Sequence, residues 1–598
     1  MKKGNKAFAK VLAMVLAVTS LLGATGCGGG GADSSTTTVI KVANFGGGVG
    51  RKWLDEACAR FKTLVADKEY SAGKKGVEFD ITHNTSVKID GIKSDATHIY
   101  FLQDKYANYY TEIQKDSVLD ITDIVKEETL SEYGEEVTIE SKIDEEFRFA
   151  MKGNDGKYYM LPHYETLNGP SYDVDLFVEQ GLYLADQGGA TGGATGFDCA
   201  LLGDDTYYFV NDEYTTKSVG NDGIAGTYDD GLPTTLNELV AQCAYIKSKG
   251  IYPFGVSGAH IDYSAHLIEG LWTGLAGYEQ RQAVVSHKVT DGVMEYVTGE
   301  SSEELWTGTG IKKPTTEKVT GLNSETAYKA IDQASRYYAF AFMELANDQG
   351  WFYDKYKDSG YTHKDAMKYF LLNGTGSGES KIPLIASHIE GSYWYNEAKY
   401  IHELMADYKL YTGKDVKNIA HWHMPTSYGD EVVTSEENAR EEANTNSFTA
   451  NALINGNLDD RPGKEGTIRA CKDFLKFLST EQELRNFTAC TGVSKALYKY
   501  TIDDSVLSNL DLYQKTVMDL RANNRIVNQY GDNATYRAQA NVLTYMCSSV
   551  GYRPDITGNS PVASVLTAIF EKGQTAWQCF KLTGYDADTW RNQYYVAG

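Results

Sequence analysis

The sequence has few prolines and, after its first 22 residues, no long apolar run. Ten prolines stand against 58 glycines in 598 residues. A helix that spans a bilayer needs about 20 consecutive apolar residues, and no later stretch of the chain approaches that length. The body of the protein is therefore expected to fold outside the membrane, and it is long enough for two or three conventional domains or one large two-lobed one.

Positive charge is also in short supply. Lysine and arginine together number 57 against 81 aspartates and glutamates, which gives a formal net charge of -24. Because a strongly acidic surface repels phosphate backbones, the composition argues against nucleic acid as a partner. The 43 tyrosines supply many flat amphipathic surfaces, which suit sugars as well as cores.

The cysteines lack any metal-binding or paired spacing. Beside Cys27 there are seven, an odd number that cannot pair fully within the chain, and none stands in a C-x-x-C pair. Cys58 and Cys471 fall within helical apolar patterns, so they are predicted to be buried free thiols.

The N-terminus reads as an export signal. Four lysines in the first ten residues precede an apolar segment over residues 11–22, which is too short to span a bilayer. Ala24-Thr25-Gly26-Cys27 resembles a bacterial lipobox, in which the cysteine carries diacylglycerol. Residues 1–26 are therefore predicted to be a signal peptide and residues 27–38 a lipidated tether. The alternative is an ordinary secretory signal with an incidental cysteine.

The body begins with a strand, a glycine loop and a helix. Residues 39–45 alternate as a strand does, residues 46–50 are mostly glycine, and an amphipathic helix follows. Its apolar face is predicted to hold Trp53, Leu54, Ala57, Phe61 and Leu64. A phosphate-binding loop is an alternative, but the Lys-Ser/Thr pair of a P-loop and the acidic residue of a dinucleotide site are missing.

Further strands and helices alternate along the chain. Strands are predicted at 77–81, 97–102 and 156–162, and a helix near Asp104. Residues 233–246 carry a helix start, with Thr or Asn as the cap, and a strand follows at 250–254. This alternation predicts a doubly wound α/β fold.

The order of these segments resembles the extracellular solute-binding proteins of ABC importers, in particular the maltose-binding-like family 1. The similar stretches, which cover most of residues 39–495, are the first strand with its glycine loop and helix, 99–106, 157–177, 233–254, 389–394 and 470–479. The resemblance implies two α/β lobes joined by crossing strands, with the ligand in the cleft between them. It places residues 39–165 and 420–498 in lobe one and residues 168–418 in lobe two. Residues 178–232 would be an insertion in lobe two, and the helices of 499–598 would mostly belong to it.

Polar candidates for ligand binding on lobe one follow the predicted strands. The resemblance implies a place in the cleft for the glycine loop and for the first crossing between lobes. The candidates are Gly47, Gly48, Asp104, Lys105, His163, Tyr164 and Glu165. Surface charge and a hinge hydrogen bond are the alternative for the last five.

On lobe two the candidates are mainly aromatic. Tyr393 and Trp394, with Glu390, lie where the family has an aromatic turn, so they are expected to stack against a sugar. Trp272 stands in a helical apolar pattern, where core packing is an equal alternative. His421 and Trp422 fall at the second crossing; His421 and His423 share one face of a strand, which permits either zinc binding or hydrogen bonding.

A loop with Asp222, Asp229 and Asp230 offers oxygen atoms on a glycine-rich turn. Ca2+ takes six to eight oxygen ligands of this kind, although the order does not match an EF-hand. A structural Ca2+ and a solvated surface turn remain as alternatives, and no other cofactor is expected.

Together these patterns predict a monomeric, lipid-anchored receptor on the outer face of a bacterial membrane. It would capture an oligosaccharide in the cleft and deliver it to an ABC permease, without enzymatic activity. Two rivals remain: an exported glycoside hydrolase, which would use two carboxylates about 5 to 9 Å apart, and a peptide-binding or adhesive surface lipoprotein.

Overall fold

The computed structural model describes residues 36–85, 87–103, 106–186, 196–203, 205–288, 293–429, 443–459, 463–528, 530–537, 565–583 and 586–596. The leader, Cys27, Asp104 and Lys105 lie outside these residues, so what the sequence predicts for them stays a prediction. Within the described ranges, no helix combines the length and the apolar character needed to cross a bilayer.

Lobe one is built on a six-stranded sheet with the order β16-β15-β5-β1-β4, in which β6 also pairs with β15. The strands are β1 (Thr38–Phe45), β4 (Val77–Asn84), β5 (Ile99–Gln103), β6 (Met160–Leu167), β15 (Ala443–Ile454) and β16 (Arg525–Val527). β1 runs parallel to β4 and to β5, with Val42 opposite both Ile81 and Ile99. β15 runs antiparallel to β5 and β6, so the late segment of the chain completes the first sheet.

Helices cover this sheet. They are α2 (Lys52–Leu64), α3 (Tyr106–Gln114), the short α4 (Ile139–Lys142), α12 (Glu465–Leu478) and α13 (Glu481–Thr491), beside a small hairpin of β2 (Glu69–Ser71) and β3 (Lys74–Lys75). The ring of Phe61 in α2 lies 5.1 Å from that of Phe474 in α12. Leu64 is 42 % exposed, so the apolar face of α2 ends earlier than predicted. Cys58 and Cys471 are free and buried, as predicted.

Lobe two is built on a four-stranded sheet with the order β10-β13-β7-β14. Its strands are β7 (Pro170–Asp173), β10 (Tyr252–Gly255), β13 (Ile385–Ile389) and β14 (Ile419–His421). Its helices are α5 (Val174–Gln180), α6 (Leu236–Ser248), α7 (Ala265–Ser286), α8 (Ala334–Asp348), α9 (His363–Leu371), α10 (Trp394–Asn396) and α11 (Leu404–Thr412). β10 and β13 are parallel, whereas β7 runs antiparallel to β13 and β14.

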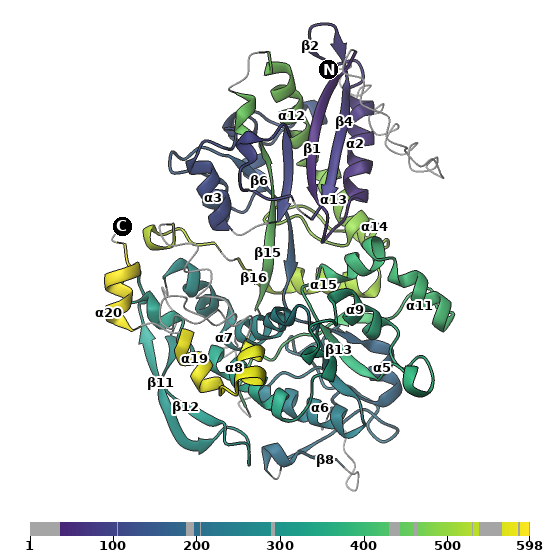
Figure 1. Cartoon of the computed structure of the whole chain (residues 1–598), viewed down its shortest axis with the longest axis vertical. Helices are drawn as coiled ribbons and strands as arrows, with labels where there is room; N and C mark the ends of the chain where they lie inside the picture. The colour runs from purple at the N-terminus through teal and green to yellow at the C-terminus, as the bar shows by residue number, and fades with distance from the viewer. Residues whose placement is uncertain are drawn as a thin grey trace.

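Smaller hairpins and the C-terminal helices complete the molecule (Figure 1). They are β8 (Phe197–Asp198) with β9 (Thr206–Tyr207), β11 (Val293–Glu304) with β12 (Lys312–Thr320), and α14 (Asp504–Leu507), α15 (Leu512–Asn523), α18 (Val565–Lys572), α19 (Ala576–Thr583) and α20 (Ala587–Thr589). α15 packs on β14, and α18 and α19 pack on α8, so these late helices lie on lobe two.

The start of α6 illustrates how local sequence sets an element. The hydroxyl of Thr235 accepts the backbone N–H of Glu238 at 3.1 Å, and the Glu238 carboxylate accepts the N–H of Thr235 at 3.1 Å. This reciprocal capping box satisfies two N–H groups that the first turn leaves without partners. The predicted helix start, with a threonine as its cap, is confirmed.

The chain crosses between the lobes along neighbouring strands, as Figure 1 shows around β15. β6 leads directly into β7 of the other sheet, and β14 precedes β15, which returns to lobe one. The predicted fold class, two α/β lobes joined by crossing strands, is confirmed. The predicted return at residue 420 is wrong, because β14 pairs with β7 and Trp422 packs in lobe two at 5.6 Å from the ring of Phe177; lobe one resumes at β15.

Trp394 belongs to the hydrophobic core of lobe two. It is 0 % exposed, and its indole N–H donates to the Ser171 hydroxyl at 2.8 Å. The rings of Phe370 and Tyr513 lie 5.7 and 5.8 Å from it. A tryptophan enclosed in this way has no face available to a sugar, so the stacking role predicted for Trp394 does not fit its position.

Replacing Trp394 is therefore expected to affect folding. Trp394→Ala should lower the free energy of unfolding by about 3–5 kcal/mol, because it leaves a large cavity. Urea unfolding followed by circular dichroism measures this. Leu410→Ala serves as the control, since Leu410 is 78 % exposed, and it should change stability by less than about 0.5 kcal/mol. Equal stability of the two variants would contradict the core assignment.

Candidate functional site: the cleft between the lobes

The parallel strands of both sheets end near the contact between the lobes, where Gly48 is hydrogen-bonded to Glu397. In lobe one, β1 ends at Phe45 before the loop 46–50, and β5 ends at Gln103. In lobe two, β13 ends at Ile389 before the turn that carries Glu390 and Tyr393. Ligands of open α/β sheets bind in the crevice outside the carboxyl ends of the strands. The strand polarity therefore marks this junction between the lobes, called the cleft below, as the candidate site.

A hydrogen bond between Gly48 and Glu397 joins the lobes across the cleft. The backbone N–H of Gly48 donates to Oε1 of Glu397 at 2.7 Å. Gly48 has a φ of +61°, and a Cβ added there would lie 2.5 Å from the hydroxyl of Tyr164. A glycine is thus needed at this position both for the left-handed conformation and for the close approach of the loop.

On lobe one, Tyr164 stands beside the glycine loop. Its hydroxyl donates to Oε1 of Gln103 at 2.9 Å. Burial, with Glu397 nearby, raises the pKa of Tyr164, so the phenol stays protonated. Of the lobe-one candidates within the described residues, the structure brings Gly47, Gly48 and Tyr164 together here.

On lobe two, a histidine, two tyrosines and the hinge asparagine form the facing wall. Nδ1 of His266 lies 2.5 Å from Oδ1 of Asn168. The side-chain nitrogen of Asn168 donates to the carbonyls of Thr445 and Asn446, so its oxygen faces His266 and assigns the ring proton to Nδ1. The ring of His266 lies 5.8 Å from Tyr263 and 6.1 Å from Tyr393.

Two carboxyl groups of lobe two lie in an environment that disfavours their charge. Burial raises the pKa of Glu397 to about 7, against the lowering effect of the Gly48 N–H. Burial also raises the pKa of Glu390 and lowers that of His388 to about 3. The Glu390 carboxyl therefore keeps its proton and meets a neutral His388, whose Nε2 lies 3.0 Å away.

Two further histidines stand near Glu397. Among the described residues, one group of three side chains has metal-binding spacing: His363, Glu397 and His402, whose ligand atoms all lie within 4.8 Å of one another. Burial lowers the pKa of both imidazoles, which are neutral near pH 7. This edge of the cleft thus offers nitrogen and oxygen lone pairs rather than positive charge.

Three predicted ligand residues lie in hydrophobic cores. His163 packs between the rings of Trp53 and Phe101, and Lys495 donates to its Nδ1 at 2.8 Å. Because successive side chains of a strand point to opposite faces, β6 turns His163 inward and Tyr164 toward the glycine loop. Trp272 and Trp422 are both 0 % exposed. Like Trp394, these three residues cannot reach a ligand in the cleft.

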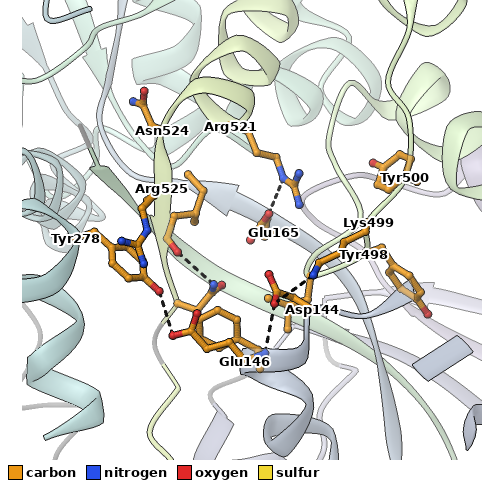
Figure 2. A pocket seen from close by; sticks show the side chains of 14 residues that line it. Asp144, Glu146, Glu165, Tyr278, Tyr498, Lys499, Tyr500, Arg521, Asn524 and Arg525 are labelled. Carbon is orange, nitrogen blue, oxygen red and sulfur yellow. Dashed lines mark hydrogen bonds and ion pairs between the residues drawn. The ribbon is translucent and has the colours of Figure 1, made fainter. Parts of the chain in front are cut away.

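Glu165 lines a pocket of about 370 Å³ at the hinge. Figure 2 shows Glu165 paired with Arg521 there, at 2.8 Å. The guanidinium of Arg525 lies 3.5 Å over the ring of Tyr278, whose hydroxyl reaches Glu146 of lobe one at 3.4 Å. The pocket therefore has walls from both lobes, and its charged groups already have partners from this chain.

His421 has a hinge position rather than a metal-binding one. Its Nε2 donates to the carbonyl of Asn168 at 3.1 Å, which ties the second crossing to the first. The ring of His423 lies 6.4 Å away. The group with metal-binding spacing in the described part of the chain does not include this pair, so the hydrogen-bonding alternative fits His421 better.

The carboxylates of the aspartate loop accept hydrogen bonds from groups of the same loop. Asp222 accepts the N–H of Ile224 at 2.7 Å, Asp229 accepts the hydroxyl of Thr227 at 2.7 Å, and Asp230 accepts the N–H of Gly226 at 2.7 Å. These three carboxylates do not form a group with metal-binding spacing among the described residues. The geometry favours the surface turn over the Ca2+ site.

The spacing of His363, Glu397 and His402 in the sequence does not predict that they lie together. Glu397 and His402 stand five residues apart, whereas an α-helix brings together residues three or four apart. The structure has a π-helix at Glu397–Ile401, in which the N–H of His402 donates to the carbonyl of Glu397 at 2.8 Å. Single π-turns are frequent at functional sites, but none of the sequence patterns used above predicts them.

Comparison with known proteins gives little beyond this geometry. No protein-family model and no curated protein matches the sequence. Among solved structures, the chain is similar to MsmE of Bacillus subtilis subsp. subtilis str. 168, described as a binding protein in an open conformation, with 10% identity and a TM-score of 0.47 over 94% of this chain and 99% of that one. A similarity of this size carries no information on the ligand of this chain.

The glycine loop can be tested for its part in holding the lobes together. Gly48→Ala should move the loop away from Tyr164, break the hydrogen bond to Glu397 and increase the radius of gyration in small-angle X-ray scattering. Gly73→Ala is the matched control, because Gly73 has a similar φ of +74° with open space around it. Both variants carry roughly 1–2 kcal/mol of backbone strain, but only the first should open the molecule. Identical scattering of the two would contradict this role.

Proposed function

We propose that this protein is a two-lobed receptor for a solute, which it captures in the cleft between the lobes. The observation that carries this proposal is the meeting of both sets of strand carboxyl ends at one cleft, bridged by Gly48 and Glu397. A solute that contacts both lobes favours the closed arrangement only through those added contacts. Binding of the solute and closure of the lobes are then thermodynamically coupled.

The residues of the cleft favour a carbohydrate as the solute. The insertion that enlarges lobe two favours an oligosaccharide. Sugar recognition needs flat aromatic faces for C–H groups and planar polar groups for hydroxyls. Tyr164, Tyr263 and Tyr393 supply aromatic faces, and Gln103 supplies an amide. Tyr393 replaces Trp394 as the residue proposed for stacking, because its ring lies beside His266 at the junction of the lobes, whereas Trp394 packs inside the core of lobe two. Tyr393 is also buried in this arrangement, so its face would become available to a solute when the lobes part.

The cellular role is proposed from the N-terminal sequence. Cys27 would carry the diacylglycerol anchor on the outer face of a bacterial membrane, where two acyl chains give stable attachment. The receptor, acting as a monomer, would hand its solute to the transmembrane subunits of an ABC permease. No step of this role requires catalysis.

A thermal-shift screen of the full-length chain against plant and host oligosaccharides tests the ligand. A ligand present at about 100 times its Kd stabilises the folded protein by about 2.7 kcal/mol, so a clear rise in Tm is expected with one sugar class. Tyr393→Ala should weaken that sugar by about tenfold or more in calorimetry, since it removes a buried aromatic contact.

Tyr411→Ala is the control for this experiment, because Tyr411 lies in α11 and is 61 % exposed. It should bind the sugar as the unaltered protein does. Stabilisation by peptides alone would support the peptide-binding rival, and release of shortened sugars would support the hydrolase. Unchanged affinity in Tyr393→Ala would remove this residue from the site.

The anchor has its own test. Cys27→Ser should shift the protein from the membrane fraction to the soluble fraction of the cells that express it, because the thioether to diacylglycerol can no longer form. Cys58→Ser, at a buried thiol of lobe one, should leave the protein with the membrane. Retention of the Cys27→Ser variant in washed membranes would refute the lipobox.

A further inference from the structure

His363, Glu397 and His402 converge from two separate elements of lobe two. His363 is the first residue of α9, whose cap Thr362 bonds reciprocally with Asp365. Glu397 and His402 stand at the two ends of the π-turn, which stacks them on one face. The ring centroids of the two histidines are 5.6 Å apart. All three side chains are half-buried at the edge of the cleft.

The cluster has groups still open to a ligand. Nδ1 of His363 is buried, and in the described part of the chain it has no hydrogen-bond partner. A buried polar atom of this kind is unfavourable unless something pairs with it. Imidazole is the side chain that most often binds metal ions in proteins.

We propose that His363, Glu397 and His402 form a binding site for a divalent transition-metal ion of the Zn2+ class at the lobe-two edge of the cleft. Two imidazole nitrogens and one carboxylate oxygen are ligands that Zn2+ takes, whereas Ca2+ and Mg2+ take oxygen only. This site goes beyond the proposed receptor function, with which it shares Glu397. Its residues differ from those of the aspartate loop and of the His421–His423 pair.

The geometry requires only small side-chain movements. Zn2+ bonds to nitrogen and oxygen at about 2.0–2.2 Å, so tetrahedral ligand atoms stand about 3.4 Å apart. The three ligand atoms already lie within 4.8 Å of one another. Three protein ligands leave the fourth position for water or a solute. Because Oε1 of Glu397 accepts the N–H of Gly48, the same carboxylate would serve both the metal and the contact between lobes.

Isothermal titration of the metal-free, full-length chain with zinc chloride tests the site without any sugar. One equivalent of Zn2+ should bind, and Co2+ should give the visible absorption of a tetrahedral centre. His363→Ala and His402→Ala should each lower Zn2+ affinity by about tenfold or more. His83→Ala, which removes a half-buried imidazole from lobe one, should leave the affinity unchanged.

A third variant, Glu397→Gln, separates loss of the metal site from loss of folding. Its amide oxygen still accepts from Gly48, so the lobes stay in contact, but the loss of negative charge should weaken Zn2+ about tenfold. The proposal is overturned if the unaltered protein binds no stoichiometric Zn2+. It is also overturned if folded His363→Ala and His402→Ala proteins bind Zn2+ as tightly as the unaltered one, because another site would then hold the ion.

Discussion

The cleft depends on the burial of one carboxyl group, that of Glu397, between the two lobes. Removing a carboxylate from water is unfavourable unless hydrogen bonds replace the solvent. The N–H of Gly48 provides one such bond at 2.7 Å, yet burial still raises the pKa of Glu397 to about 7. The carboxyl group is therefore only partly compensated for its loss of solvent at the contact between lobes. A receptor that opens and closes needs a contact that can break and reform.

The contact can form because the hinge fixes how the lobes face each other. β6 continues into β7, and β15 lies antiparallel to β6, so two neighbouring strands connect the sheets. Asn168 lies between them: its side chain donates to the carbonyls of Thr445 and Asn446 and accepts from His266. These bonds make the crossing a defined pivot. In the receptor that we propose, rotation about this crossing would move the glycine loop relative to Glu397 while both sheets stay intact.

Sequence patterns predicted the architecture better than the site. Alternating strands, the helix cap at Thr235 and the glycine loop are local signals, and the corresponding elements are present. The sequence predicts a ligand-binding role for Trp394 and His163, but both lie in hydrophobic cores, because the sequence around an aromatic residue next to a turn is similar whether the ring faces a core or a sugar. His163 and Tyr164 are neighbours in β6, yet the first lies in the core and the second at the cleft. The sequence does not predict that Glu397 and His402 lie close together, because their proximity depends on a π-turn. His363 joins them only through tertiary packing.

The two walls of the cleft differ in hydrogen-bonding character, and the difference constrains the solute. Lobe one offers the Gly48 N–H, whereas lobe two offers the carboxyl of Glu397. When the lobes part, a bridging solute must accept from Gly48 and donate to Glu397. An anion would satisfy Gly48 but meet the Glu397 carboxyl, and a cation would satisfy Glu397 but leave the Gly48 N–H without an acceptor. Hydroxyl groups both donate and accept. A neutral polyhydroxylated solute can therefore bridge both walls without an unmatched charge.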